Sequence, residues 1–284
     1  MQVNSIITIT GNDLPEELQV LPQPPALLNL KGNASLLGSH PRVGIVGARK
    51  FTPYGREVTA NIASVLGRAG VTVISGLALG VDSIAHKACL DSHGKTIAIL
   101  PSGIEKIYPA SHSQLAKQIV ESDGLLASEY PSNYNPQRHD FLRRNRIIAG
   151  LSDILVITEA GIASGSLNTA RHALDQGITI MAVPGNITSP YSSGTNRLIQ
   201  AGAIPLLDPQ EILTYLGMES ENQQEYIPEN EIEKLLITNI GTGISGTNDL
   251  INTCGVEPSE LQTHLTMLEI KGVLGVQGGQ WRLL

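Results

Sequence analysis

A short basic segment that contains an aromatic ring is the part of the chain best suited to bind a ligand. Residues 138–146, RHDFLRRNR, hold four arginines and Phe141, one of only two phenylalanines. Guanidinium groups neutralise phosphates, and a phenyl ring stacks on a base where the strand is single and its bases are free. The segment favours single-stranded nucleic acid as the ligand, although an amphipathic helix with a solvated basic face explains these nine residues equally well.

Three turns share a place directly after an apolar, strand-like run and before a helical one. They contain Arg49 and Lys50, then Ser75, Gly76 and Gly80, and finally Ser164, Gly165 and Ser166. A helix that starts after such a turn presents free backbone N–H groups to an anion. A glycine needed only for a tight turn explains any one of them as well. The convergence of all three on one edge of a sheet is what favours ligand binding.

The composition suits an α/β domain followed by a smaller one. The chain has 284 residues, 29 glycines and 4% aromatic residues, as expected of a sheet of Val, Ile and Leu covered by helices. Cys89 and Cys254 lie far apart on predicted helices, so the cysteines indicate neither a disulfide framework nor a metal site and favour a reducing, cytoplasmic setting. No window holds the roughly 18 apolar residues of a membrane span, so we expect no membrane association.

Apolar runs alternate with helical runs along residues 42–207. The apolar runs are VGIVG, VTVIS, TIAIL, LLASEY, DILVIT, ITIMAV and IPLL. Unbroken apolar strands with helical crossovers predict a parallel sheet covered on both faces, and hence an extended Rossmann-like domain over residues 42–217. Residues 1–41 are rich in proline and are predicted to form an irregular lead-in, and residues 218–230 a linker. Because parallel strands end at one edge, this sheet brings the three turns together.

The pattern changes in residues 231–284. Helical runs stopped by Gly255 and Gly272 precede a hairpin that turns at Gly278 and Gly279. Three helices and a hairpin in this order predict a small winged-helix domain.

The charge is concentrated in the same part of the chain. Residues 219–284 carry 3 Lys and Arg against 10 Asp and Glu, whereas residues 1–218 carry 16 of each. A helix that enters a DNA groove must approach two lines of phosphates, which this surface would repel. We therefore expect the winged helix not to hold DNA.

Several motifs of nucleotide enzymes are missing. The chain has no G-x-x-x-x-G-K followed by Ser or Thr, and its second strand ends in Ser75 where a dinucleotide enzyme usually carries an acid. Glu159 ends a strand, where it suits either acid/base chemistry or the capping of the next helix, which is the commoner role. The histidines show no metal-ligand spacing. We therefore expect no cofactor, no metal and no enzymatic activity.

Seven segments in order resemble the DNA-processing protein A family, also called DprA or Smf. They are GIVGARK, SGLALGVDSIAHKACL, the IYP of residues 107–109, SEYP, FLRRNRIIAGLSD, TEAGIASGSLNTARHALDQG and PGNITSPYSSGTNRLIQAGA. The resemblance covers the body of the chain, and the tail matches the winged-helix extension of the family. It implies an extended Rossmann fold that binds single-stranded DNA and a mediator that loads the RecA recombinase during natural transformation.

The resemblance also assigns residues. It places the DNA pocket at the three turns and the basic segment, that is, at Arg49, Ser75, Gly76, Gly80, Arg143, Arg144, Asn145, Arg146, Ser164, Gly165 and Ser166, to which we add Lys50 for its charge and Phe141 for its ring. It further implies a homodimer through a helix over residues 195–204, which carries Leu198, Ile199 and Ile204, although such apolar residues equally suit ordinary packing on a sheet.

A second interpretation belongs to another class of protein. Sheets of this kind also resemble nucleotide phosphoribohydrolases, which would use Arg146 and Glu159 to hold and cleave a nucleoside monophosphate. The glutamate that such enzymes carry after a Gly-Thr pair is missing after Gly194 and Thr195. The basic surroundings also exceed what one phosphate requires. A winged-helix transcription regulator with a sensing domain is a third interpretation, which the acidic tail disfavours.

Overall fold

The computed structural model describes residues 5–218, 226 and 228–283 of the chain, which divides into two compact units, Met1–Ser220 and Glu221–Leu284. Each unit is described by itself. Most of the predicted linker, residues 219–225 and 227, lies outside the described residues.

A nine-stranded sheet forms the centre of the first unit. Its strands are β1 (Ile7–Thr10), β2 (Leu27–Gly32), β3 (Arg42–Val46), β4 (Thr72–Ser75), β5 (Thr96–Leu100), β6 (Leu125–Ser128), β7 (Ile154–Ile157), β8 (Thr179–Ala182) and β9 (Ile204–Pro205). Their spatial order is β1-β2-β6-β5-β4-β3-β7-β8-β9, and β3 to β9 pair in parallel. The predicted α/β fold with a parallel sheet is confirmed.

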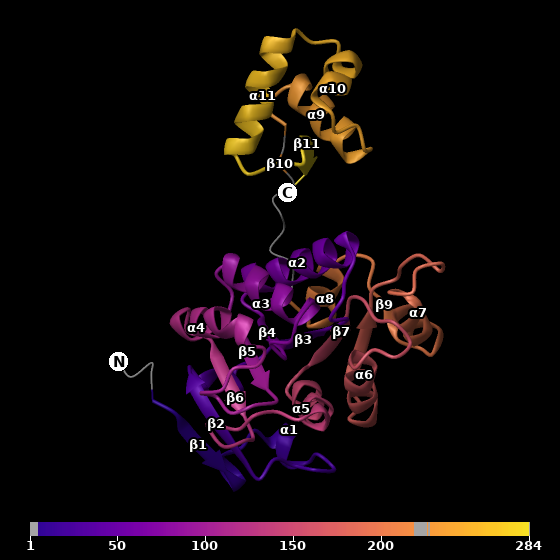
Figure 1. Cartoon of the computed structure of the whole chain (residues 1–284). Helices are drawn as coiled ribbons and strands as arrows, with labels where there is room; N and C mark the ends of the chain where they lie inside the picture. Colours follow the sequence, from indigo (N-terminus) through magenta and orange to yellow (C-terminus); the bar gives the residue numbers. More distant parts are fainter. Residues whose placement is uncertain (1–4, 219–225, 227, 284) are drawn as a thin grey trace. The chain divides into compact units, whose positions relative to one another are not determined.

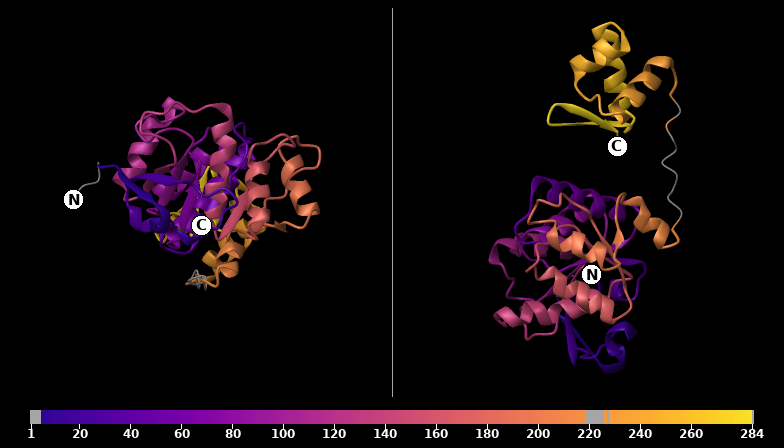
Figure 2. Two further views of the ribbon diagram at one scale, coloured as in Figure 1. Left: turned by 90° about the horizontal axis from the view of Figure 1, so that it is seen from below. Right: turned by 90° about the vertical axis from the view of Figure 1, so that its right-hand side faces the viewer.

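The sheet is covered on both faces. Every residue of β3 to β7 is buried, which explains why these strands read as unbroken apolar runs. The helices of this unit are α1 (Glu16–Gln19), α2 (Pro53–Arg68), α3 (Val81–Asp91), α4 (Ser113–Glu121), α5 (Arg138–Gly150), α6 (Ser166–Asp175), α7 (Ser193–Gln200) and α8 (Gln210–Tyr215). Figure 1 shows α2 and α3 along one side of the sheet and α5 and α6 along the other, and Figure 2 shows the same layers from two more directions.

The prediction of an irregular lead-in over residues 1–41 is wrong. β2 pairs antiparallel with β6, and β1 pairs antiparallel with β2, so this segment extends the parallel sheet by two strands. Leu28 and Leu30 of β2 are buried while their neighbours are partly exposed, which is the alternation of a strand with one covered face.

The predicted helix over residues 195–204 is also wrong in its extent. α7 ends at Gln200, and Ile204 lies in β9, which is the last strand of the described sheet. Gly202, with φ of +106°, allows the turn between them.

The second unit has the predicted elements in the predicted order. It consists of α9 (Glu231–Gly241), α10 (Thr247–Cys254), α11 (Pro258–Ile270) and a hairpin of β10 (Leu274–Gln277) and β11 (Gln280–Leu283). Gly278 and Gly279 have φ of +61° and +79°, as the tight hairpin turn requires. Leucines of all three helices pack with Leu274 and Trp281 into a core of their own. Within the described parts of both units, no helix is long and apolar enough to cross a membrane.

Candidate nucleic-acid interface

The turns after β3 and β4 are pressed together at the carboxyl edge of the sheet. Strand order reverses beside β3, which lies between β4 and β7, and ligands of open α/β sheets bind at this point. Gly80 has φ of +88°, and a Cβ there would lie 2.3 Å from the carbonyl oxygen of Ala48. The backbone N–H of Val81 donates to the same oxygen at 3.2 Å. Only glycine permits this contact, which brings the second turn against the first.

An exposed cation and two aromatic rings form a cluster at this edge. The guanidinium carbon of Arg49 lies 4.8 Å from the centre of the Phe141 ring, and the Tyr108 ring meets Phe141 edge-on at 5.5 Å. Arg49 and Lys50 are exposed, Phe141 is half-buried and Tyr108 is 48% exposed. The prediction omitted Tyr108 from the site, although its IYP motif had been singled out.

Buried hydrogen bonds position the start of α5, which carries Phe141. The carboxylate of Asp140 accepts hydrogen bonds from the hydroxyl groups of Tyr130 and Tyr134, both at 2.9 Å, and from the backbone N–H of Gln137 at 2.7 Å. Burial raises the pKa of Asp140, but these three donors outweigh it and hold the pKa below its usual value. The rings of Tyr130 and Tyr134 stack at 4.7 Å. Asp140 is therefore an ionised anchor that fixes the helix end.

The structure separates the arginines of α5 into two kinds. Arg138 is exposed, and the side chain of Arg143 is 55% exposed with its Nε 3.4 Å from a carboxylate oxygen of Glu129. Arg144 and Arg146 are 3% and 4% exposed. Only the first kind is free to meet a phosphate from solvent.

The buried side chain of Arg144 supports the turn after β4 through hydrogen bonds. Its Nη1 donates to the carbonyl oxygens of Gly76, at 2.6 Å, and of Ile99. Burial lowers the pKa of Arg144 to about 10, opposed by the nearby carboxylate of Asp82, whose own pKa burial raises. A Cβ on Gly76 would lie 2.4 Å from the guanidinium group, so glycine is needed there to admit Arg144. The side chain of Arg144 thus holds the site together and is not on its surface.

Arg146 is held by a buried ion pair. Its Nη2 donates to Glu129 at 2.6 Å, and each of the two side chains is 5% exposed. Because the Glu129 carboxylate already neutralises the guanidinium group of Arg146, this side chain has little attraction left for a phosphate.

The side chain of Ser75 is likewise unavailable to DNA. It is fully buried, and its hydroxyl donates to the carbonyl oxygen of Ile45 at 2.6 Å. The predicted roles of the Arg144 and Arg146 side chains as surface contacts are therefore corrected to structural ones, whereas the predicted phosphate contact of Ser75 through its backbone N–H stays a prediction.

The third predicted turn opens α6 beside α5. Gly165 is exposed, and the hydroxyl groups of Ser164 and Ser166 lie 2.7 Å apart. Asn145 donates through Nδ2 to the carbonyl oxygen of Gly165 and to Asn168 Oδ1, both at 3.3 Å. Asn145 thus fastens the turn to α5. The first N–H groups of α6 already have partners, since that of Ser166 donates to Ser164 Oγ at 3.4 Å, and those of Leu167 and Asn168 donate to the carbonyl oxygens of Ser164 and Gly165, both at 3.1 Å.

Glu159 caps a helix, but an earlier one than predicted. Its carboxylate accepts from the backbone N–H of Thr52 at 2.9 Å and from the Thr52 hydroxyl at 2.6 Å, at the start of α2. The predicted cap was on the helix that follows in sequence. Among the described residues, no group of three or more His, Cys, Asp or Glu could hold a metal ion.

Comparison with known proteins gives consistent matches over the first unit. The family model described as DNA recombination-mediator protein A matches residues 5–217. Protein Smf of Escherichia coli is 36% identical over 280 residues, which cover 95% of this chain and 75% of that protein. The DNA processing protein DprA of Bacillus subtilis is 38% identical over 210 residues, covering 74% of this chain and 70% of that protein.

Two solved structures share the fold. DNA processing protein A from Streptococcus pneumoniae has a TM-score of 0.69 and 34% identity, with 75% of each chain covered. DNA processing protein A from Helicobacter pylori, described for its single-stranded DNA binding mode, also has a TM-score of 0.69, with 32% identity over 76% of this chain and 98% of that one.

Proposed function

Because the chain belongs to the DNA recombination-mediator protein A family, we propose that it binds single-stranded DNA at the carboxyl edge of its sheet. The observation that carries this proposal is the exposed cluster of Arg49, Phe141 and Tyr108 at the point where strand order reverses. The similar Helicobacter pylori protein is described as binding single-stranded DNA, which supports the same ligand here.

Different exposed groups contact the phosphates and the bases of the strand. Arg49, Lys50 and Arg143 neutralise phosphates, and the turn of Ser164, Gly165 and Ser166, which is exposed at Gly165, contacts a further one. The ring of Phe141 stacks on an unpaired base, flanked by Tyr108. None of these groups reads the hydrogen-bonding edge of a base, so binding is nearly indifferent to sequence. The glycine turn at Gly76 and Gly80 shapes the surface.

The wider role that we propose is that of a recombination mediator. In this role the protein acts in the cytoplasm during natural transformation and loads the RecA recombinase on incoming single strands. The family description supports a mediator of recombination.

We also propose a homodimer through α7 and β9. Leu198 and Ile204 already pack partly against the core of the first unit, while Ile199 is half-buried and absent from those core clusters. Replacing Ile199 by Glu should give a folded monomer by light scattering. A dimer of unchanged size would contradict this interface.

The protein acts in this proposal without catalysis. The phosphoribohydrolase alternative needs Arg146 and Glu159 to act on one nucleotide. Arg146 is bound to Glu129, and Glu159 is bound to Thr52, so each is already engaged by a different structural partner. Release of free base from a nucleoside monophosphate that disappears on Glu159→Gln would overturn this part of the proposal.

Fluorescence anisotropy tests the central proposal directly. The full chain should bind labelled single strands of different sequence with similar affinity and the matching duplex much more weakly, because only unpaired bases can stack on Phe141. In a second arm, the protein should speed RecA assembly on a strand coated with single-strand-binding protein. Equal binding of duplex and single strand would contradict the site, and unchanged assembly would contradict the mediator role alone.

A further inference from the structure

A buried carboxylate lies between two arginines of α5, one of which is exposed at the carboxyl edge of the sheet. Glu129 directly follows β6, so the central sheet fixes its backbone, and its side chain is 5% exposed. One oxygen, Oε2, accepts from Nη2 of the buried Arg146 at 2.6 Å. The other, Oε1, has no hydrogen-bond partner among the described residues and lies 3.4 Å from Nε of Arg143. The cluster thus contains a buried acceptor that lacks a donor.

Arg143 can supply the missing donor. A buried carboxylate oxygen without a hydrogen bond is unfavourable, because water no longer solvates it. Arg143 and Arg146 are three residues apart on α5, so their side chains are neighbours on the helix. The 3.4 Å between Nε and Oε1 is slightly longer than a normal N–H···O hydrogen bond. A small rotation of the Arg143 side chain therefore closes this bond.

The contact with Glu129 does not cancel the charge of Arg143. Two guanidinium groups and one carboxylate leave one positive charge in the cluster. Arg146 is buried and lies at hydrogen-bond distance from the carboxylate, so it takes most of the negative charge. The side chain of Arg143 is 55% exposed, and the remaining positive charge therefore faces solvent.

A guanidinium group presents different edges to a carboxylate and to a phosphate. It is planar and has five N–H donors in fixed directions, one on Nε and two on each Nη. When Nε donates to Oε1 of Glu129, the four Nη hydrogens stay available, and this end of the group fits two oxygens of a phosphate. A side chain that is already held in the binding orientation loses less freedom when its ligand arrives.

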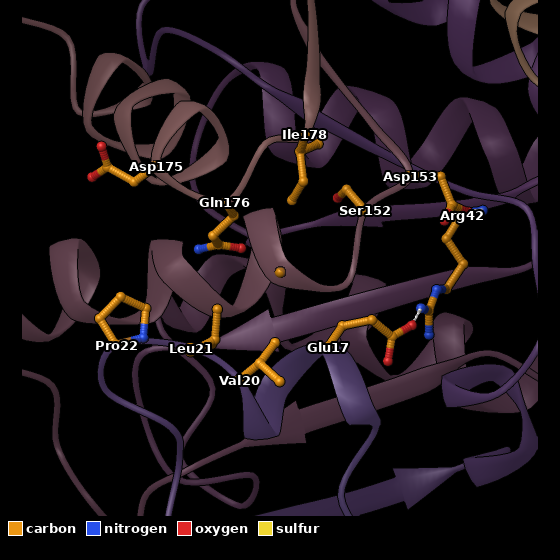
Figure 3. Close-up of a pocket in the computed structure, with 11 residues that line it drawn as sticks. Glu17, Val20, Leu21, Pro22, Arg42, Ser152, Asp153, Asp175, Gln176 and Ile178 are labelled. Atoms are coloured by element: carbon orange, nitrogen blue, oxygen red, sulfur yellow. Dashed lines mark hydrogen bonds and ion pairs between the residues drawn. The ribbon is translucent and has the colours of Figure 1, made fainter.

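A carboxylate at the amino edge of the sheet pairs with an arginine in a different way. There Glu17 is turned toward Arg42, and both line a groove of about 440 Å³ (Figure 3). Arg42 is 1% exposed and also donates to the carbonyl oxygen of Leu37, so its partners enclose it. Glu129, in contrast, contacts one arginine in the interior and one at the surface. This arrangement leaves the outer arginine able to reach a ligand.

We propose that Glu129 is a positioning residue of the DNA site. Its Oε1 accepts a hydrogen bond from Nε of Arg143 and turns the Nη end of that side chain toward a phosphate of the bound strand. This role rests on the proposed binding of single-stranded DNA. A carboxylate close to the phosphates then strengthens binding, although its charge alone would weaken it.

Removal of the carboxylate charge separates these two effects by their sign. Glu129→Gln in the full chain should weaken binding of a labelled single strand about two- to threefold, since Arg143 contributes no more than an exposed charge contact. Repulsion alone predicts a rise in affinity instead. Arg143→Lys keeps the charge but has no guanidinium Nε, so it should cause a similar loss. The double variant should bind as each single variant does.

A matched control accounts for the loss of stability. Glu129→Gln leaves Arg146 without its counter-ion, so binding is measured on the folded fraction, counted by stoichiometric titration. Ile148→Val, a core change on the same helix, lowers stability without touching Arg143 and should leave affinity unchanged. A rise or no change in the affinity of folded Glu129→Gln would overturn the positioning role. So would additive losses in the double variant.

A measurement without DNA tests the contact itself and does not depend on any variant. In the wild-type chain labelled at arginine, nitrogen relaxation should show restricted motion at Nε of Arg143 and free motion at Nε of Arg68, which is exposed at the end of α2. Equal mobility of the two would overturn the positioning role even if the protein binds DNA. If Arg143 is ordered but the wild type binds no single strand, the proposed DNA site fails, and the role of Glu129 fails with it.

Discussion

The carboxyl edge of the sheet and the C-terminal unit both have an architecture that other proteins use to bind nucleic acids, yet they differ in available charge. At the sheet edge, Arg49, Lys50 and Arg143 are exposed beside aromatic rings. In the C-terminal unit, which was predicted to be a winged helix, α11 is the third helix and contains no lysine or arginine. Its exposed residues include Met267 and Ile270, which are 47% and 75% exposed.

The cation that follows α11 is already bound. Lys271 Nζ lies 2.8 Å from Glu229 and 3.4 Å from Glu233, and it donates to the hydroxyl of Tyr226 at 2.6 Å. Hydrogen bonding to Glu229, and then to Tyr226, raises the pKa of Lys271, so it stays charged within this acidic group. The comparison leads us to expect that a fold used for nucleic-acid binding need not carry a nucleic-acid-binding surface, because the exposure of the side chains and their available charge decide.

The largest expected effect tests whether buried arginines belong to the surface. Arg144→Met should lower the free energy of unfolding by about 3–5 kcal/mol in urea, because two carbonyl oxygens lose their buried donor and the buried carboxylate of Asp82 loses a nearby cation. Arg143→Met, one residue away and exposed, should change it by less than about 1 kcal/mol. If Arg144→Met were fully stable but bound DNA less tightly, Arg144 would be a phosphate ligand. The carboxyl edge of the sheet would then be more basic than its exposed residues suggest.

The next effect concerns the exposed cations. Arg49→Ala combined with Arg143→Ala should weaken binding of a mixed-sequence oligonucleotide about tenfold to thirtyfold, because two exposed charge contacts at up to about 1 kcal/mol each contribute roughly 1.4–2 kcal/mol together. The slope of log affinity against log salt should fall by about 0.7 for each lost phosphate contact. Arg68→Ala, at the far end of α2, is the control. Unchanged affinity and slope in a folded double variant would place the DNA elsewhere.

A smaller effect isolates the aromatic ring. Phe141→Leu keeps an apolar side chain but removes the stacking face, so single-strand affinity should fall about fivefold, or about 1 kcal/mol. Phe51→Leu should leave affinity unchanged, since the Phe51 ring lies under Arg56 instead, at 4.8 Å. Similar losses from both substitutions would show that the cluster around Phe141 has no special role.

The smallest expected effect is on the C-terminal unit. Truncation after Gly217 should change single-strand affinity by less than about twofold, because the deleted part is acidic. A rise in affinity would indicate that the tail competes for the basic edge. If the truncated protein still melts cooperatively but clearly loses affinity, the C-terminal unit binds DNA. This result would contradict the expectation based on its acidic charge.

The order of the elements was readable from the sequence because buried parallel strands leave a strong local pattern. The unbroken runs of β3 to β7 reflect burial on both faces, and the glycine pair at 278 and 279 marks the hairpin. β2 was missed because it follows a proline-rich stretch and depends on pairing with β6, almost 100 residues away, and β1 was missed because it pairs only with β2.

The arginines of α5 show what the sequence alone determines and what only the tertiary structure decides. The sequence by itself determined that residues 138–146 are basic, helical and aromatic at one position. Arg143, Arg144 and Arg146 differ only by their angle around one helix, and which angle is buried depends on Gly76, Ile99 and Glu129 from other parts of the sheet. Sequence spacing specifies the angle between these side chains. Only the packed first unit supplies the carbonyl and carboxylate oxygens that hold two of them in the interior, while Arg143 stays exposed to a ligand.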